Sequence, residues 1–136
     1  MKQHFLEVKT DGRGLINITK KIAECVAATK VETGLCHVFL QHTSASLALC
    51  ENADPLVLSD LEAFMQRTVP DGDPVYEHTD EGEDDMPSHI RSIITHNSLT
   101  IPITHGKLAL GTWQGIFLWE HRVRGCVRKV VVTVQG

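Results

Sequence analysis

The sequence lacks a long hydrophobic run, a closely spaced pair of cysteines and an excess of positive charge. No apolar segment reaches the ~20 residues that a helix needs to cross a bilayer. Residues 1–10 alternate polar and apolar side chains and contain no apolar block of the kind found in signal peptides. We therefore expect a protein of the cytoplasm that has no membrane partner.

The cysteines and the charge exclude two further classes of protein. Cys25, Cys36, Cys50 and Cys126 lie far apart, without the CxxC pairs of zinc-binding motifs, so we expect reduced and mostly buried thiols. The chain has 13 Lys and Arg against 17 Asp and Glu, a formal net charge of −4. Because proteins that bind nucleic acid without regard to sequence are normally basic, we expect no nucleic-acid partner.

The length and the hydrophobic pattern predict the fold class. The 136 residues, of which 42% are hydrophobic and 22% charged, suit a single globular domain spanning residues 1–136. The C-terminal half lacks the helices that parallel strands would need between them. We therefore expect an α+β fold, a largely antiparallel, β-sandwich-like sheet with two to three helices. Helical patterns cover residues 17 or 19 to 30, 54 to 67 and 86–95, and strand patterns cover 2–9, 31–44, 46–51, 98–104, 107–110, 111–122 and 126–134.

A long polar and acidic segment, residues 69–85, interrupts this pattern. Loops of this length inside a compact domain are uncommon unless they are functional. His78 lies in this segment, and no spacing argument connects it to another polar residue. We expect His78, together with His37 and His105, to be a surface residue.

The first polar motif, residues 42–46, follows a strand that is apolar on both faces. His42 is then either a buried histidine that bonds to backbone or a residue at the point where the core meets a cleft. Thr43, Ser44 and Ser46 follow it, and hydroxyls with free backbone N–H groups at a strand end can bind phosphate oxygens.

Acidic and amide side chains come next. Asp54 stands before Pro55 and suits the N-cap of a helix. Asn52 and Asp60 lie on either side of this helix start. Carboxylates near a histidine can hold Mg²⁺ through oxygen, although exposed acids on a helix commonly hold nothing.

A second histidine, His89, stands near the start of the third helix. His89 and His96 are seven residues apart, so they share a helix face but are too distant to chelate one ion directly. His89 can still meet His42 across the fold, and the N-terminus of a helix favours an anion.

The last motif lies between residues 111 and 122. Trp113 and Trp119 are typical of a core or an interface. The glycines around Thr112 and Gln114 indicate either a β-bulge or backbone that approaches a ligand. Arg122 is either a phosphate clamp or an ordinary arginine at the end of a strand.

These motifs, "HTSASL", "ENADP", "DDMPSHIRS", "SLTIPI" and "GKLALGTWQGIFLWEHR", together resemble the YjbQ-like family of small bacterial and archaeal proteins over nearly the whole chain. The resemblance implies an α+β fold with much antiparallel sheet, a homotrimer, and the activity of a secondary thiamine-phosphate synthase. Such a transferase joins a hydroxymethylpyrimidine pyrophosphate to a thiazole phosphate and releases pyrophosphate. Where some relatives carry a second histidine before the third-motif histidine, this chain has Pro87.

The motifs and the resemblance together predict a phosphate-handling enzyme whose partner is a small phosphorylated metabolite. The predicted catalytic residues are His42, His89 and Asp60, and His42 and His89 are the predicted ligands of a divalent metal, Mg²⁺ or Zn²⁺. The predicted substrate-binding residues are Thr43, Ser44, Ser46, Asn52, Lys107, Thr112, Trp113, Gln114 and Arg122, and the resemblance adds Asp54, Gly111 and Glu120.

Two other functions fit the same residues. One is a metal-dependent hydrolase in which a carboxylate, Cys36 or Cys50 completes the ligand set of His42 and His89. The other is a module that binds a phosphorylated metabolite without catalysis.

Overall fold

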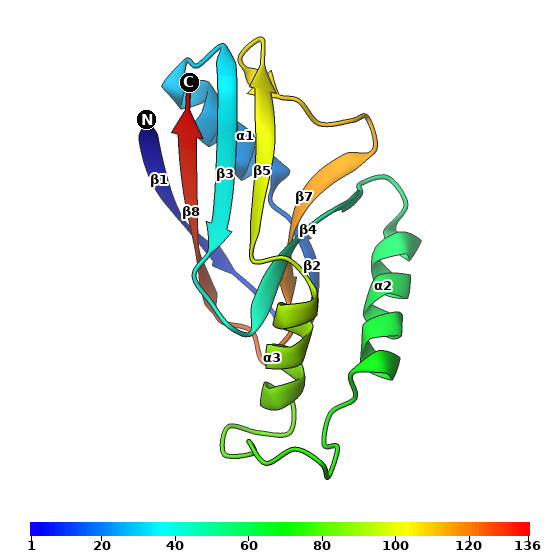
Figure 1. The fold of residues 1–136 in the computed structure, drawn as a ribbon. Coiled ribbons are helices and arrows are strands. Elements are labelled where there is room, and N and C mark those ends of the chain that lie inside the picture. Colours follow the sequence, from blue (N-terminus) through cyan, green and yellow to red (C-terminus); the bar gives the residue numbers. More distant parts are fainter.

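A computed structural model describes all residues from Met1 to Gly136 and shows two antiparallel sheets with three helices (Figure 1). One sheet has the strand order β1-β8-β3-β5-β6 and the other the order β2-β7-β4. The predicted α+β fold with largely antiparallel strands is thereby confirmed. The elements are β1 (Lys2–Lys9), β2 (Gly14–Asn17), α1 (Thr19–Thr29), β3 (Thr33–Leu40), β4 (Ala45–Glu51), α2 (Pro55–Thr68), α3 (Asp85–Ile94), β5 (Ser98–Thr104), β6 (Lys107–Leu108), β7 (Gln114–Glu120) and β8 (Val127–Gln135).

The main core lies where the inner face of the five-stranded sheet meets α1 and the second sheet. Alternate residues of β3 and β8 point inward, so that Val38 and Val132, which pair across the two strands, are fully buried. The helix α1 contributes Ile22 and Val26, four residues apart on one face. Burial of a side chain of this size stabilises the fold by about 1.5–3 kcal/mol.

The strand β7 is buried on both sides, which explains why its sequence is apolar on both faces. Ile116 and Leu118 belong to the main core, whereas Trp119 packs with Met65 and Val69 at the end of α2. The second sheet therefore lies between the main core and the helices α2 and α3.

The helix α2 begins as the sequence predicts. Asp54 is its N-cap, and the carboxylate accepts a hydrogen bond of 2.9 Å from the backbone N–H of Leu56. None of the helices combines the length and the apolar character that a membrane span requires.

The helix α3 buries polar side chains and exposes apolar ones. Asp85, Ser88 and Arg91 are buried, while Ile93 and Ile94 are exposed. This inversion brings charged and polar groups of α3 toward the interior, where they meet β4 and the end of β7.

The strand β2 is not predicted by the sequence. It pairs with β7 from Gly14 opposite Glu120 to Asn17 opposite Phe117. Four residues carry too little pattern to reveal a strand, because the pairing with β7 and not local propensity determines their conformation.

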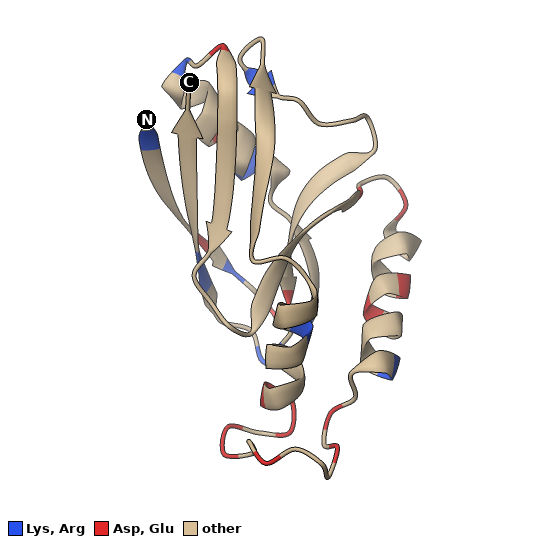
Figure 2. Ribbon diagram, viewed as in Figure 1, with Lys and Arg blue, Asp and Glu red and all other residues tan.

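The acidic segment between α2 and α3, residues 69–84, forms the end of the molecule opposite the chain termini (Figure 2). Two arginines hold it. Arg13 donates two hydrogen bonds of 2.6 Å to Asp71, and Arg122 donates to Asp84 at 3.0 Å and to the carbonyl of Glu81 at 2.9 Å. The loop is therefore attached to the body of the protein near both of its ends.

Candidate functional site

A cleft of about 820 Å³ opens beside α3. Its volume is in the range of small-molecule sites, roughly 300–1,000 Å³. Its walls come from the segment after β3, the acidic loop, α3 and the start of β5. The lining residues are His42, Thr43, His78, Met86, His89, Ser92, Ile93, Thr95, His96, Asn97 and Ser98.

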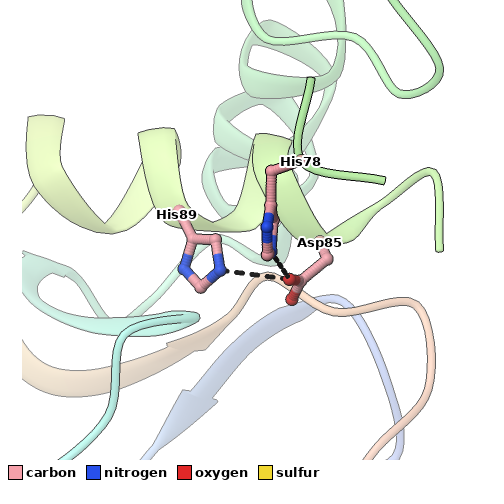
Figure 3. A group of neighbouring side chains, drawn as sticks. All are labelled: His78, Asp85 and His89. Atoms are coloured by element: carbon pink, nitrogen blue, oxygen red, sulfur yellow. Dashed lines mark hydrogen bonds and ion pairs between the residues drawn. The ribbon is translucent and has the colours of Figure 1, made fainter. Parts of the chain in front are cut away.

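Two imidazoles and a carboxylate converge at this cleft (Figure 3). The Nε2 atom of His78 lies 2.7 Å from Oδ2 of Asp85, and the Nε2 atom of His89 lies 3.1 Å from the same oxygen. One ligand atom from each residue lies within 4.8 Å of the other two. Asp85 and His89 are one turn apart on α3, and His78 comes from the acidic loop.

The other ring nitrogen of His89 determines how the ring is oriented. Nδ1 lies 2.9 Å from the backbone carbonyl of Thr43, and a carbonyl oxygen only accepts, so Nδ1 carries a proton and donates it. In a neutral ring the lone pair is then on Nε2 and points to Asp85. A histidine that donates one N–H to a carbonyl and turns its other nitrogen inward is the arrangement of metal-ligating histidines. Without a cation the same geometry suits an ion pair between a protonated His89 and Asp85.

Arg122 holds Asp85 from the opposite side. Its Nη1 atom donates to Oδ1 of Asp85 at 2.7 Å, which leaves Oδ2 to the two histidines. Burial raises the pKa of Asp85, but the hydrogen bond from His78 and the charges of His89 and Arg122 outweigh it, so the pKa is below its ordinary value. Asp85 is therefore a carboxylate with a fixed orientation. The guanidinium of Arg122 is occupied by acids and by a carbonyl, so it does not line the cleft as the predicted phosphate clamp.

His42 lines the cleft, but its ring is held by β8. Its Nε2 atom accepts a hydrogen bond of 2.7 Å from the backbone N–H of Lys129, and its Nδ1 atom lies 3.3 Å from Nη1 of Arg128. Burial and the charge of Arg128 lower the pKa of His42. Since Nε2 already accepts, a neutral ring carries its proton on Nδ1. This geometry makes His42 a fixed wall of the cleft and leaves neither ring nitrogen directed at the cluster of His78, Asp85 and His89.

A buried ion pair anchors the motif that follows His42. Arg128 donates from Nε to Glu120 at 2.8 Å, and its Nη2 atom donates to the carbonyl and to the hydroxyl of Ser44 at 3.1 and 3.0 Å. Burial raises the pKa of Glu120, but the hydrogen bonds from Arg128 and Thr10 lower it by a larger amount. The pKa is therefore below its ordinary value, and Glu120 is a carboxylate. The hydroxyl of Ser44 thus accepts from Arg128, and Ser44 is not among the residues that line the cleft.

Ser46 is fully buried and does not reach the cleft. Its hydroxyl lies 2.8 Å from Nε2 of His121, which is also fully buried. Burial and the charge of Arg91 lower the pKa of His121 to about 3, and its Nδ1 atom has no hydrogen-bond partner. His121 is therefore a neutral core histidine.

A second group of predicted residues lies at the other end of β4. The backbone N–H of Asn52 donates to the carbonyl of Trp113 at 3.0 Å, and its side chain donates to the carbonyl of Gln114 at 3.2 Å. The seven residues of β4 separate this group from Ala45 by about 20 Å. The residues that the sequence assigns to one cavity therefore lie in two places. The two predicted motifs flank opposite ends of the pair β4 and β7, with Ala45 and Glu120 at one end and Glu51 and Gln114 at the other.

Other predicted residues also lie outside the cleft. Asp60 is exposed on α2, Lys107 is exposed on β6, and Thr112 is exposed before β7. Cys36 is buried in the core, where burial raises the pKa of its thiol to about 11. Cys50 does not line the cleft either. The carboxylate that accompanies the histidines is Asp85.

His78, Asp85 and Arg128 are among the residues that the sequence-based prediction missed at this site. His78 is exposed, as the sequence predicts, but its ring also meets Asp85 in the cluster, which the sequence does not predict. The spacing of Asp85 and His89, four residues on one helix, is a signal that could have revealed that pair. Arg128 gives no such signal, since only strand pairing brings it to Glu120 and Ser44.

The comparisons with known proteins agree with this architecture. The family model described as "UPF0047 protein YjbQ-like" matches residues 4–136. The UPF0047 protein sll1880 of Synechocystis is 53% identical over 134 residues, which cover 98% of this chain and 91% of the relative. The UPF0047 protein YjbQ of Salmonella typhimurium is 49% identical and covers 98% of this chain and 97% of its own length.

Two solved structures have the same fold. The structure of APE1520 from Aeropyrum pernix superimposes with a TM-score of 0.90 at 30% identity and covers 100% of this chain and 99% of its own. The structure of TT1486 from Thermus thermophilus gives a TM-score of 0.85 at 36% identity, over 97% of this chain and 99% of its own. Since the family model and close relatives both match over nearly the whole chain, the protein belongs to the YjbQ-like UPF0047 family.

Proposed function

We propose that the protein is a metal-dependent enzyme that acts on a small phosphorylated metabolite, with a divalent ion held by His78, Asp85 and His89. The observation that carries the proposal is the convergence of two imidazole nitrogens on one carboxylate oxygen at the edge of a large cleft. Two imidazoles and one carboxylate suit Zn²⁺ and similar transition metals better than Mg²⁺, which prefers oxygen ligands. Of the two metals that the sequence suggests, we therefore propose zinc.

Three protein ligands leave a coordination position for water or substrate, and a metal in such a site polarises a phosphoryl oxygen and activates a water. The chain's own residues orient this site. The carbonyl of Thr43 holds the ring of His89, and Arg122 holds the carboxylate of Asp85. His42 and Thr43 form part of the wall of the cleft. Hydrolysis of a phosphate ester is the reaction that this arrangement supports best.

Transfer of the thiamine-phosphate synthase type is the second candidate. The resemblance of the motifs implies it, and the volume of the cleft favours it, because both substrates of such a transfer must lie together. Release of pyrophosphate also needs a cation to neutralise the leaving group.

We also propose a homotrimer in the cytoplasm with no nucleic-acid partner. The outer face of the five-stranded sheet supports an association of copies. Phe5 and Phe39 both pair with Val131 in neighbouring strands, and their side chains are 73% and 41% exposed. Contiguous apolar surface of this kind marks an interface. A trimeric mass in light scattering, reduced to a monomeric mass by Phe5→Glu, supports this assembly, and a monomeric mass of the unmodified protein contradicts it.

The test of the proposed function measures metal and turnover together. Protein purified without added metal is analysed by mass spectrometry and is then loaded with Zn²⁺ or Co²⁺. We expect one ion per chain, lost in His89→Ala and Asp85→Asn and retained in His105→Ala, whose side chain is exposed in the turn after β5. Aryl phosphate hydrolysis and thiamine phosphate formation are then assayed with the loaded enzyme.

The outcomes separate the candidates. Metal-dependent hydrolysis that disappears in His89→Ala supports the hydrolase, and metal-dependent formation of thiamine phosphate supports the transferase. A protein that binds a phosphorylated metabolite tightly but converts none across a broad panel is a binding module. Failure to bind a stoichiometric ion, or full turnover by His89→Ala, contradicts the proposed metal site.

A further inference from the structure

The only titratable side chains that line the cleft are histidines. Of its eleven lining residues, four are histidines, five carry a hydroxyl or an amide, and two, Met86 and Ile93, are apolar. Neither lysine nor arginine and neither aspartate nor glutamate is among them. A site for several phosphate groups normally presents arginines or lysines to them.

Two guanidinium groups beside the cleft, those of Arg122 and Arg128, are already neutralised. The guanidinium of Arg122 contacts Asp84 through Nε and Asp85 through Nη1. Arg128 is 4% exposed and bonds to Glu120, which is fully buried. Neither group is free to approach an anion in the cleft, and Lys129, whose charge acts on His42, does not line it, so the proposed metal supplies the cation for the ligand.

The charge of the proposed metal centre sets how much negative charge it can match. Asp84 and Asp85 face the single guanidinium of Arg122, so a divalent ion on neutral imidazoles leaves one net positive charge. A phosphate monoester carries between one and two negative charges near neutral pH, because its second pKa is about 6. One such group is close to matched, whereas a second phosphate adds negative charge that nothing in the cleft compensates.

The wall beyond the metal cluster offers neutral hydrogen-bonding groups. The side chains of Thr43, His96, Asn97 and Ser98 make no hydrogen bond within the chain, although the backbone of residues 96–98 is well fixed. The carbonyl of His96 accepts from Leu47 at 2.6 Å, and the carbonyl of Asn97 accepts from Leu40 at 2.9 Å. The backbone is thus pinned to β3 and β4 while the side chains remain free to bind hydroxyl or amide groups of a ligand.

We propose that the cleft selects a ligand with a single phosphate group on an uncharged, hydroxyl-bearing body, and that it discriminates against bisphosphates and diphosphates. This inference rests on the proposed function, because the metal supplies the positive charge among the groups that line the cleft. It favours hydrolysis of a monophosphorylated metabolite over transfer from a pyrophosphate.

The experiment compares matched probes on the Co²⁺-loaded protein, in which the visible spectrum of the ion reports binding. The probes are propyl phosphate, 1,3-propanediol bisphosphate and glycerol 3-phosphate. We expect the bisphosphate to bind about tenfold more weakly than propyl phosphate, as an uncompensated charge near the site predicts. Glycerol 3-phosphate should bind more tightly than propyl phosphate, and Asn97→Ala should reduce that advantage.

A charge introduced into the wall is the decisive variant. Asn97→Lys should remove the preference for the monophosphate, whereas Thr104→Lys, at the far exposed end of β5, should retain it. Equal or tighter binding of the bisphosphate by the unmodified protein overturns the inference, and so does a loaded protein that binds none of the three probes. A chain that takes up no Co²⁺ contradicts the proposed function itself, so the two failures are distinguishable.

Discussion

The buried histidine at the end of β7 predicts a stability that depends on pH. His121 is fully buried, contacts only the hydroxyl of Ser46 through its ring nitrogens, and leaves Nδ1 without a partner. Protonation would place a charge in the interior beside Arg91, so burial and that charge lower its pKa from 6.5 to about 3. The folded protein therefore resists a proton that the unfolded chain accepts.

The direction and the size of this pH dependence follow from the difference between the pKa of His121 in the folded and in the unfolded chain. Because the folded pKa is depressed, the stabilising contribution is present above pH 6.5 and is lost as the pH falls toward 3. Between pH 7 and pH 5 the unfolded chain takes up about 0.7 proton at this position, and the folded chain takes up almost none, which lowers the free energy of unfolding by about 2 kcal/mol. Lowered carboxylate pKa values, such as that of Glu120, add losses of the same sign below about pH 4.5.

Urea unfolding of the metal-free protein at pH 7 and pH 5 measures the effect. The variant His121→Gln can keep a hydrogen bond to Ser46 but does not titrate, so its loss of stability between the two pH values should be smaller by about 2 kcal/mol. His105→Gln, in an exposed turn, is the matched control and should behave as the unmodified protein does. Identical pH dependence in His121→Gln and the unmodified protein would refute the reasoning.

Two further predictions concern the metal site and a helix end. Arg122→Met should release Asp85 and thereby weaken Co²⁺ binding about 10- to 100-fold, as measured by visible spectroscopy. Arg124 is exposed and makes no side-chain hydrogen bond, so Arg124→Met should bind Co²⁺ as the unmodified protein does. Equal affinities of the two variants would count against a positioning role for Arg122. Asp54→Ala should lower the free energy of unfolding by about 1 kcal/mol through loss of the N-cap, and Asp60→Ala, on the exposed face of α2, should change it little in the same urea titration.

Periodicity predicts those parts of the fold in which burial follows from the element alone. The alternating residues of β3 and β8 and the four-residue spacing in α1 lead directly to the core. The cap of α2 follows from Asp54 and Pro55 in the same local way. The strand β2 does not, because its conformation comes from pairing with β7.

The candidate site is only partly predictable, for a related reason. His42, Thr43 and His89 line one cleft, as their chemistry suggests. His78 is brought to Asp85 by a loop whose path depends on the anchors Arg13 and Arg122, and no periodicity encodes that path. The helix α3 buries a polar face, although helices usually turn their apolar residues inward. The position of its apolar residues therefore does not predict that Asp85 is buried.

The three ligands of the proposed metal site come from two different segments, and this has a consequence for the acidic loop. An ion bound to His78 and to the helix residues Asp85 and His89 joins the middle of the loop to α3 and closes a short ring of chain. If the proposed site takes up an ion, its loading and unloading are thereby tied to the conformational freedom of residues 69–84. The rate at which the amides of this loop exchange with solvent deuterium becomes a direct gauge of site occupancy.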